Sequence, residues 1–281
     1  MYSDELDETR HEAELKSIFR RNETKSATDV VARSRQIALS SALRRVEFWI
    51  SRRTILASNE GLTNVNEVYR NILRQIEIDR SDLISDSEMM DLSNRLDIIN
   101  KRTADFSKYE IQNTISTIDF KNALENQSDY YSELSARLLK PYVESLEARI
   151  SSLDSIYNIV DKFIQIVNEM LNDKFITYTM TEGFKILNIK GHYIEVEHLS
   201  SGEQQLLLLL SHILVARDKP SVFIVDEPEL SLNVKWQRKL IDSLLELTQR
   251  SQIQFILATH SLELLSQHMD KVVPLYNRQP T

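Results

Sequence analysis

A chain of 281 residues with a formal net charge of −8 is long enough for two modest domains, and this charge excludes a uniformly basic nucleic-acid-binding surface. The absence of cysteine excludes disulfides and thiolate metal sites, and it suits a reducing cytoplasm. Four glycines and five prolines are few for this length, which favours long helices. No apolar run approaches the roughly 20 residues that cross a bilayer, and the polar first residues do not resemble a signal peptide. We therefore expect a cytoplasmic protein that does not enter a membrane.

Charge is uneven along the first part of the chain. Residues 20–53 hold nine basic and three acidic side chains. This local excess can contact the phosphates of DNA or RNA. The alternative, which such charge runs more often represent, is a solvated helix face or a contact with an acidic partner.

Residues 1–172 are predicted to be helical throughout, with the clearest pattern at 139–171. Ten apolar residues there are spaced alternately four and three apart: Leu139, Val143, Leu146, Ile150, Leu153, Tyr157, Val160, Ile164, Val167 and Leu171. Such a repeat places them on one seam of a helix that supercoils around a partner. We expect an antiparallel coiled-coil arm; a helical bundle is the alternative, because Tyr157 is bulky. A shorter helix is predicted at 65–78.

After residue 172 the pattern changes from helical to strand-like. Segments rich in β-branched and aromatic residues at 175–180, 184–189 and 192–197 are separated by turns at Gly183 and Gly191. They predict a three-stranded β-meander.

The remainder is predicted to be an α/β lobe with a parallel sheet. A helix at 206–215 is apolar on most sides, which implies burial. Short apolar runs at 222–225 and 255–258 are typical of parallel strands covered on both faces, and the helix at 233–250 joins them. The sequence thus predicts two domains: a helical region at 1–172 and an α/β lobe at 173–281.

Two carboxylates follow the first of these buried strands. Asp226 and Glu227 stand at its carboxyl end, where open α/β sheets bind ligands. One carboxylate can hold the water shell of Mg²⁺, and the next, pointing the other way, can accept a proton from an attacking water. A plain turn, Asp-Glu-Pro, is the structural alternative.

Polar residues also mark the start of the apolar helix and the end of the second strand. Ser200 can cap the helix with Glu203, and such a helix start suits an anion. Gly202 allows a close backbone approach. His260 can donate a hydrogen bond to a γ-phosphate oxygen, although a lone histidine at a strand end is more often structural.

Taken in order, these segments resemble the motifs of ABC-type ATPases. Leu-Ser-Ser-Gly-Glu-Gln at 199–204 is similar to the signature motif, Val-Phe-Ile-Val-Asp-Glu at 222–227 to the Walker B strand, and Leu-Ala-Thr-His-Ser at 257–261 to the switch-histidine segment. The pattern resembles the branch with coiled-coil arms: SMC-like proteins, double-strand-break repair ATPases, and the Septu and retron anti-phage defence ATPases. No Toprim nuclease follows before Thr281, so the overcoming-lysogenization-defect nucleases are a less similar type.

The resemblance implies roles for individual residues, with ATP and Mg²⁺ as cofactors. Asp226 would be the magnesium-associated aspartate, Glu227 the catalytic base and His260 a γ-phosphate contact. Asn233 ends the loop that crosses the dimer interface, where the family often has aspartate or histidine. The nucleotide-binding set that the resemblance implies is Ser200, Ser201, Gly202, Glu203 and Asn233.

The resemblance also implies partners. In members of the family, two ATPase heads close around two ATP molecules, so we expect a homodimer or higher oligomer. Closure would move the coiled coils, which act on DNA or RNA or on a nuclease or toxin effector.

One part of the family pattern is missing from the sequence. Such enzymes hold ATP with a phosphate loop, G-x-x-x-x-G-K-[ST], and none of the four glycines here precedes Lys-Ser or Lys-Thr. We therefore expect ATP hydrolysis only when a phosphate-loop lobe from elsewhere completes the chain. The alternatives are a non-enzymatic coiled-coil scaffold with a relic ATPase lobe and a helical nucleic-acid-binding protein that uses residues 20–53.

Overall fold

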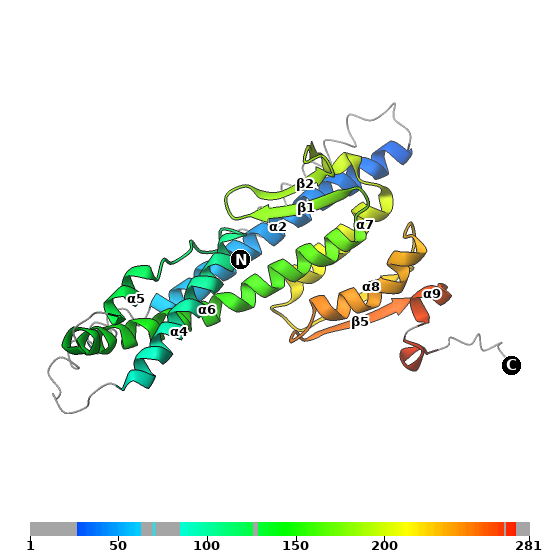
Figure 1. Cartoon of the computed structure of the whole chain (residues 1–281). Coiled ribbons are helices and arrows are strands. Elements are labelled where there is room, and N and C mark those ends of the chain that lie inside the picture. Colours follow the sequence, from blue (N-terminus) through cyan, green and yellow to red (C-terminus); the bar gives the residue numbers. More distant parts are fainter. Residues whose placement is uncertain (1–26, 63–69, 71–84, 126–128, 267, 274–281) are drawn as a thin grey trace. The chain divides into compact units, whose positions relative to one another are not determined.

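The computed structural model describes residues 27–62, 70, 85–125, 129–266 and 268–273 (Figure 1). The chain divides into two compact units whose segments alternate along the sequence. The helical unit comprises Glu47–Gln165 and Ile176–Lys185; the sheet unit comprises Met1–Val46, Ile166–Phe175 and Ile186–Thr281. The sequence predicted a single division after residue 172 instead. Of the helix predicted at 65–78, only Arg70 is among the described residues, and its backbone is helical; the rest of that range lies outside them.

The described part of residues 1–172 is mostly helical. Its helices are α2 (Ala27–Leu62), α4 (Asp86–Ser107), α5 (Ile118–Leu124) and α6 (Asp129–Met170). Residues 111–117 are irregular, so the expectation of helix throughout is wrong there. Among the helices of the described residues, none combines the length and the apolar character that crossing a bilayer requires.

The predicted apolar seam of α6 is largely buried. Val143, Leu153 and Val160 are fully buried, and Leu146, Ile150, Ile164 and Val167 are nearly so. Tyr157 is half-buried, and its ring packs 5.5 Å from that of Phe106 on α4. The bulk of this side chain is thus accommodated by an aromatic contact within the helical unit.

Ion pairs between α4 and α6 show the relative direction of the two helices. Arg95 on α4 binds Glu147 on α6 at 2.6 Å, and Lys108 just beyond α4 binds Asp161 at 2.8 Å. Arg102 binds Asp154 between these two pairs. The residue numbers of the paired side chains increase together along both helices, in steps close to one heptad. The helices α4 and α6 therefore run parallel. The expectation of an antiparallel arm is therefore wrong for this pair.

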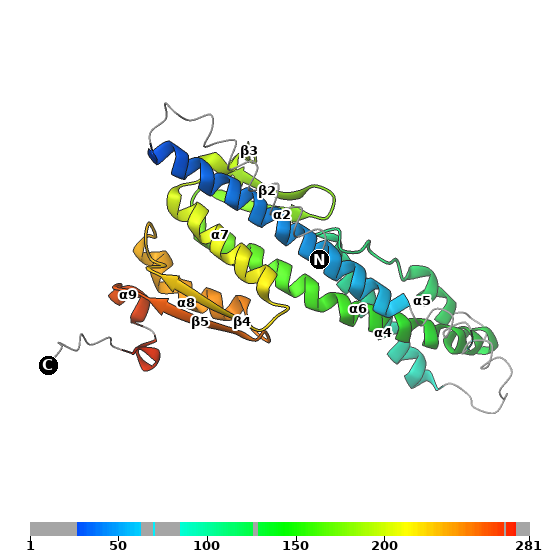
Figure 2. The same ribbon diagram turned by 180° about the vertical axis from the view of Figure 1, so that it is seen from behind.

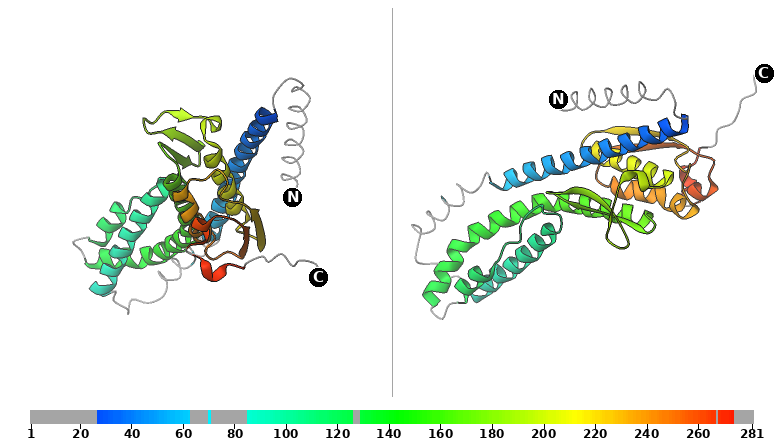
Figure 3. Two further views of the ribbon diagram at one scale, coloured as in Figure 1. Left: turned by 90° about the vertical axis from the view of Figure 1, so that its right-hand side faces the viewer. Right: turned by 90° about the horizontal axis from the view of Figure 1, so that it is seen from above.

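The connection between α4 and α6, which contains α5, explains the parallel arrangement. After α4 the chain turns back, and Lys121 on α5 binds Asp97 in the middle of α4 at 2.7 Å. The chain thus returns along α4 before α6 begins, so both helices start at the same end. By contrast, α2 runs opposite to α6 within the helical unit (Figures 1 and 3).

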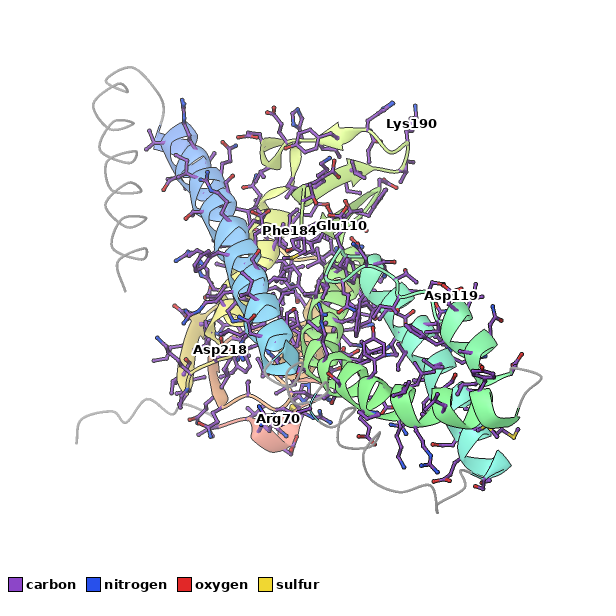
Figure 4. All side chains as sticks on the ribbon, turned by 90° about the vertical axis from the view of Figure 1, so that its left-hand side faces the viewer. Arg70, Glu110, Asp119, Phe184, Lys190 and Asp218 are labelled. Atoms are coloured by element: carbon purple, nitrogen blue, oxygen red, sulfur yellow. The ribbon has the colours of Figure 1, made fainter. Side chains whose placement is uncertain are left out.

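The predicted meander is present, with a shorter third strand. Strands β1 (Lys174–Thr179), β2 (Gly183–Asn188) and β3 (Tyr193–Ile194) form a sheet in that order. The turn between β1 and β2 is tied to the helical unit, because the amide of Thr181 donates to Glu110 at 3.0 Å (Glu110 and Phe184 are labelled in Figure 4).

The sheet unit contains the predicted parallel strands. Strands β4 (Ser221–Asp226) and β5 (Ile253–Ala258) pair in parallel, from Ser221 opposite Ile253 to Asp226 opposite Ala258. The helix α8 (Val234–Leu247) joins them and lies along one face of the pair (Figures 1 and 2).

The expectation that these strands are covered on both faces is wrong for the described residues. Exposure alternates along β4, where Ile224 is 78% exposed, and along β5, where Ile256 is 50% exposed. On the other face, Phe223 and Phe255 pack together with ring centroids 5.9 Å apart. We call the surface formed by Val222, Ile224 and Ile256 the open sheet face.

Candidate functional site

The signature-like segment builds the start of helix α7 (Ser201–Ala216). Ser200 is its N-cap: its side-chain oxygen accepts from the amide of Glu203 at 3.3 Å, and its own amide donates to the Glu203 carboxylate at 2.7 Å. Both arms of the predicted capping box are therefore formed. Ser200 and Ser201 are exposed, so this positive helix end faces solvent.

The carboxylate of Glu203 has a structural role. Glu203 is only 2% exposed, and the ammonium group of Lys174 lies 3.1 Å from each of its oxygens. A buried carboxylate is costly unless it is paired and hydrogen-bonded, and both conditions are met here. Lys174 belongs to no motif, so the sequence did not reveal it. It links the start of β1 to the signature-like segment.

Gly202 permits a close approach within the chain itself. A Cβ built at this position would lie 2.3 Å from the backbone oxygen of Ser231. Ser231 belongs to residues 227–233, which we call the post-strand loop. The sequence suggested a close approach at Gly202 without indicating that this loop makes it. Gly202 therefore joins the signature-like segment to the loop that follows the carboxylates.

The structure brings Glu227 and His260 to one edge of the parallel pair. The amide of Glu227 donates to the carbonyl of Ala258 at 2.7 Å, extending the β4–β5 pairing by one step. His260 Nε2 lies 3.7 Å from Glu227 Oε1, and the His260 side chain is 91% exposed. Asp226 is exposed at the same edge, opposite Ala258.

The backbone of Glu227 is in an unusual conformation. Its φ is 46°, in the left-handed region that side chains with a Cβ seldom occupy. Such conformations cost of order 1–3 kcal/mol and concentrate at functional sites. In this conformation the Glu227 side chain reaches the imidazole of His260.

Asn233 plays a clear structural part. It is exposed, and its side-chain oxygen accepts from the amide of Trp236 at 3.0 Å, so it caps α8. The predicted site residues therefore form two groups in the sheet unit: Ser200 to Glu203 at the start of α7, and Asp226, Glu227 and His260 at the edge of the strands. Asn233 ends the loop that contacts Gly202.

The strand edge suits a magnesium ion shared with phosphates. Mg²⁺ usually keeps several waters and binds one or two carboxylates together with substrate phosphates. The exposed carboxylate of Asp226 fits that pattern. In the part of the chain that the structure describes, no group of three His, Cys, Asp or Glu side chains can hold a metal by itself.

Comparison with curated proteins finds ATP-binding subunits of transporters. The chain is 29% identical over 161 residues to the spermidine/putrescine import ATP-binding protein PotA of Ureaplasma parvum, covering 50% of this chain and 30% of PotA. It is 33% identical over 81 residues to the dipeptide transport ATP-binding protein DppD of Escherichia coli, covering 29% of this chain and 24% of DppD. The chain thus spans about a third or less of the length of these relatives.

Among solved structures, the chain is similar to the Smc head domain with an extended coiled coil, bound to the C-terminal domain of ScpA, from Pyrococcus furiosus. The identity is 14% and the TM-score 0.30, with 76% of this chain and 52% of that chain covered. A TM-score this low does not establish a shared fold.

The family comparison covers both the helices from α4 onward and the candidate site. Residues 92–266, more than half of the chain, match the protein family described as "AAA domain, putative AbiEii toxin, Type IV TA system". That range contains the signature-like segment, the paired carboxylates and His260. The chain belongs to this family of AAA domains.

Proposed function

We propose that this chain is the signature- and Walker B-bearing part of an ABC-type ATPase, which hydrolyses ATP between two heads once a phosphate-loop lobe completes it. The observation that carries the proposal is the 3.7 Å separation of Glu227 and His260 at the carboxyl edge of the parallel strands. Ligands bind at this edge in open α/β sheets. A carboxylate and an imidazole there supply a proton acceptor and a hydrogen-bond donor.

Each residue has a distinct part in this proposal. Glu227 accepts a proton from the attacking water, and the exposed imidazole of His260 donates to the γ-phosphate. Asp226 holds Mg²⁺, which supplies charge neutralisation on the triphosphate. The exposed start of α7, with Ser200, Ser201 and Gly202, faces the γ-phosphate bound by the opposing head.

In this proposal Glu203 and Asn233 have structural roles and do not contact the reacting atoms. Glu203 stabilises the start of α7 from inside, through Ser200 and Lys174. Asn233 fixes the junction between the post-strand loop and α8.

The open sheet face supports completion by another polypeptide surface. Val222, Ile224 and Ile256 are 58%, 78% and 50% exposed. Parallel sheets are found almost only where both faces are covered. Burying one such aliphatic side chain fully contributes about 1.5–3 kcal/mol. We infer that the phosphate-loop lobe covers this face and thereby brings the triphosphate to the neighbouring strand edge.

Replacing Ile224 by glutamate tests this inference. A charge on the open sheet face opposes docking of an apolar surface but leaves the isolated chain folded, because Ile224 is exposed. In the native assembly, purified through a tag on this chain, we expect ATP affinity to fall about tenfold or more. The measurement is a nucleotide titration by calorimetry.

The matched control for Ile224→Glu is Leu245→Glu on α8, where the side chain is 43% exposed. This variant should bind ATP like the wild type. Wild-type affinity in the Ile224→Glu assembly would contradict a docking role for the open sheet face.

The helical unit is proposed to transmit the nucleotide state. Three ion pairs and the Phe106–Tyr157 contact hold α4 and α6 together, which suits movement as one body. We propose that head closure in a homodimer or higher oligomer moves this unit, in anti-phage defence or DNA- or RNA-related work with a nuclease or toxin effector. The support is the resemblance in motifs and the toxin named in the family description.

A further inference from the structure

Glu229, in the post-strand loop, contacts the segment that carries His260. Its Oε1 accepts three hydrogen bonds: from the Thr259 hydroxyl at 2.5 Å, from the amide of His260 at 3.1 Å and from the amide of Ser261 at 3.2 Å. We call residues 259–261 the histidine loop. One oxygen atom thus binds all three residues of the histidine loop.

Gln237 makes a second connection between the same two loops. Its side-chain amide donates to the carbonyl of Leu232 at 3.0 Å, and its side-chain oxygen accepts from the Ser261 hydroxyl at 2.8 Å. The Ser261 hydroxyl in turn accepts from the amide of Leu264, so Ser261 caps the helix α9 (Leu262–Leu265). The histidine loop is therefore held by the post-strand loop and by α8.

The Glu229 carboxylate is ionised when it makes these contacts. Burial alone would raise the pKa of the Glu229 carboxyl, but the hydrogen bonds from Thr259 and from the amides of His260 and Ser261 outweigh it, and the pKa lies below its usual value. Hydrogen bonds to an ionised acceptor are about twice as strong as those between neutral groups. The other oxygen, Oε2, is buried and has no hydrogen-bond partner within the described residues.

In this arrangement the backbone of His260 is held by a hydrogen bond, whereas its side chain is exposed. The amide is bound by Glu229, whereas the imidazole is 91% exposed. A fixed backbone with an exposed ring limits the positions that the imidazole samples without blocking its access to a ligand.

We propose that Glu229 is a positioning residue that fixes the histidine loop on the post-strand loop, so that the His260 imidazole meets the phosphate next to Glu227. The catalytic purpose of this contact rests on the proposed function. Glu229 touches no reacting atom; it acts through His260. Since Ser231 of the same loop contacts Gly202, the contact also joins the strand edge to the signature-like segment.

The test compares Glu229→Ala, Glu229→Gln and Thr259→Val with the wild type. Amide exchange of a peptide covering 258–265 in the chain alone reports whether the histidine loop is held. We expect exchange about tenfold faster in Glu229→Ala, with a smaller change in Glu229→Gln, which keeps one acceptor oxygen. Thr259→Val removes only one of the three donors to Glu229 and is therefore the milder substitution. It allows the same exchange measurement to be made if Glu229→Ala does not fold.

The control is Glu197→Gln, which removes an exposed carboxylate outside the peptide 258–265. It should leave exchange in 258–265 as in the wild type. Unchanged exchange in the folded Glu229 variants would overturn the proposal.

The second measurement, of kcat and KM, distinguishes a positioning role of Glu229 from a purely structural one. In the native assembly, Glu229→Gln should lower kcat several-fold at unchanged KM, because binding does not need the placement of His260. Faster exchange together with wild-type kcat would overturn the positioning role. Absence of hydrolysis in the wild-type assembly would instead overturn the proposed function and the catalytic purpose of Glu229 with it, while the exchange result would still stand.

Discussion

Replacing Glu227 by glutamine is expected to reduce ATP hydrolysis by the native assembly about a hundred- to ten-thousand-fold. Glutamine keeps the size of the side chain and can still bind a water, but it cannot accept the proton of that water. The left-handed backbone at residue 227 and the hydrogen bond from its amide to Ala258 do not depend on the side-chain charge, so ATP binding should persist. The measurement is steady-state phosphate release together with a nucleotide titration.

The matched control for this substitution is Glu195→Gln, which removes an exposed carboxylate beyond β3. It should hydrolyse ATP like the wild type. If hydrolysis and biological activity both survive Glu227→Gln, the enzymatic proposal fails and the scaffold alternative gains support.

Replacing Gly202 by alanine is expected to displace the post-strand loop and to lower stability by about 1–3 kcal/mol. The new Cβ would lie 2.3 Å from the Ser231 oxygen and 3.5 Å from the buried Trp236 ring. The closer atom belongs to the backbone, so a side-chain rotation cannot relieve the clash. We therefore expect a lower denaturant midpoint and faster amide exchange at 228–233.

The control for Gly202→Ala is Gln205→Ala, which lies one turn along α7 and is half-buried. It should leave exchange at 228–233 unchanged. A Gly202→Ala chain with the midpoint and the loop exchange of the wild type would show that the contact with Ser231 is not tight.

Local features of the fold could be predicted from the sequence because they depend on neighbours along the chain. The spacing of Ser200 and Glu203 predicted the capping box, and the 3.5-residue repeat predicted the buried seam of α6. Apolar runs flanked by turns predicted β4 and β5.

The predictions that were wrong or incomplete concern contacts between residues that are far apart in the sequence. A heptad seam shows which face of α6 is buried, but not which helix packs on it or in which direction, and α4 turned out to be parallel. A continuous apolar strand such as 222–225 predicts two covered faces, yet only one is covered in the described residues. The close approach at Gly202 was predicted without its partner, since nothing in the sequence brings Ser231 next to it.

The candidate site was predicted unevenly for the same reason. Asp226 and Glu227 lie at the carboxyl end of β4, and His260 lies just beyond β5. The carboxyl ends of adjacent parallel strands meet at one edge, so the meeting of these residues could be expected. Glu229 and Lys174 act through hydrogen bonds to residues about 30 positions away. No periodicity or motif marks such contacts.

The most direct test of the whole account is a calorimetric titration of Mg-ATP into the purified 281-residue chain. If the site is complete only with a second polypeptide surface, the isolated chain should show no binding below about millimolar nucleotide, corresponding to a free energy weaker than about −4 kcal/mol. Micromolar affinity in this chain alone would contradict the account.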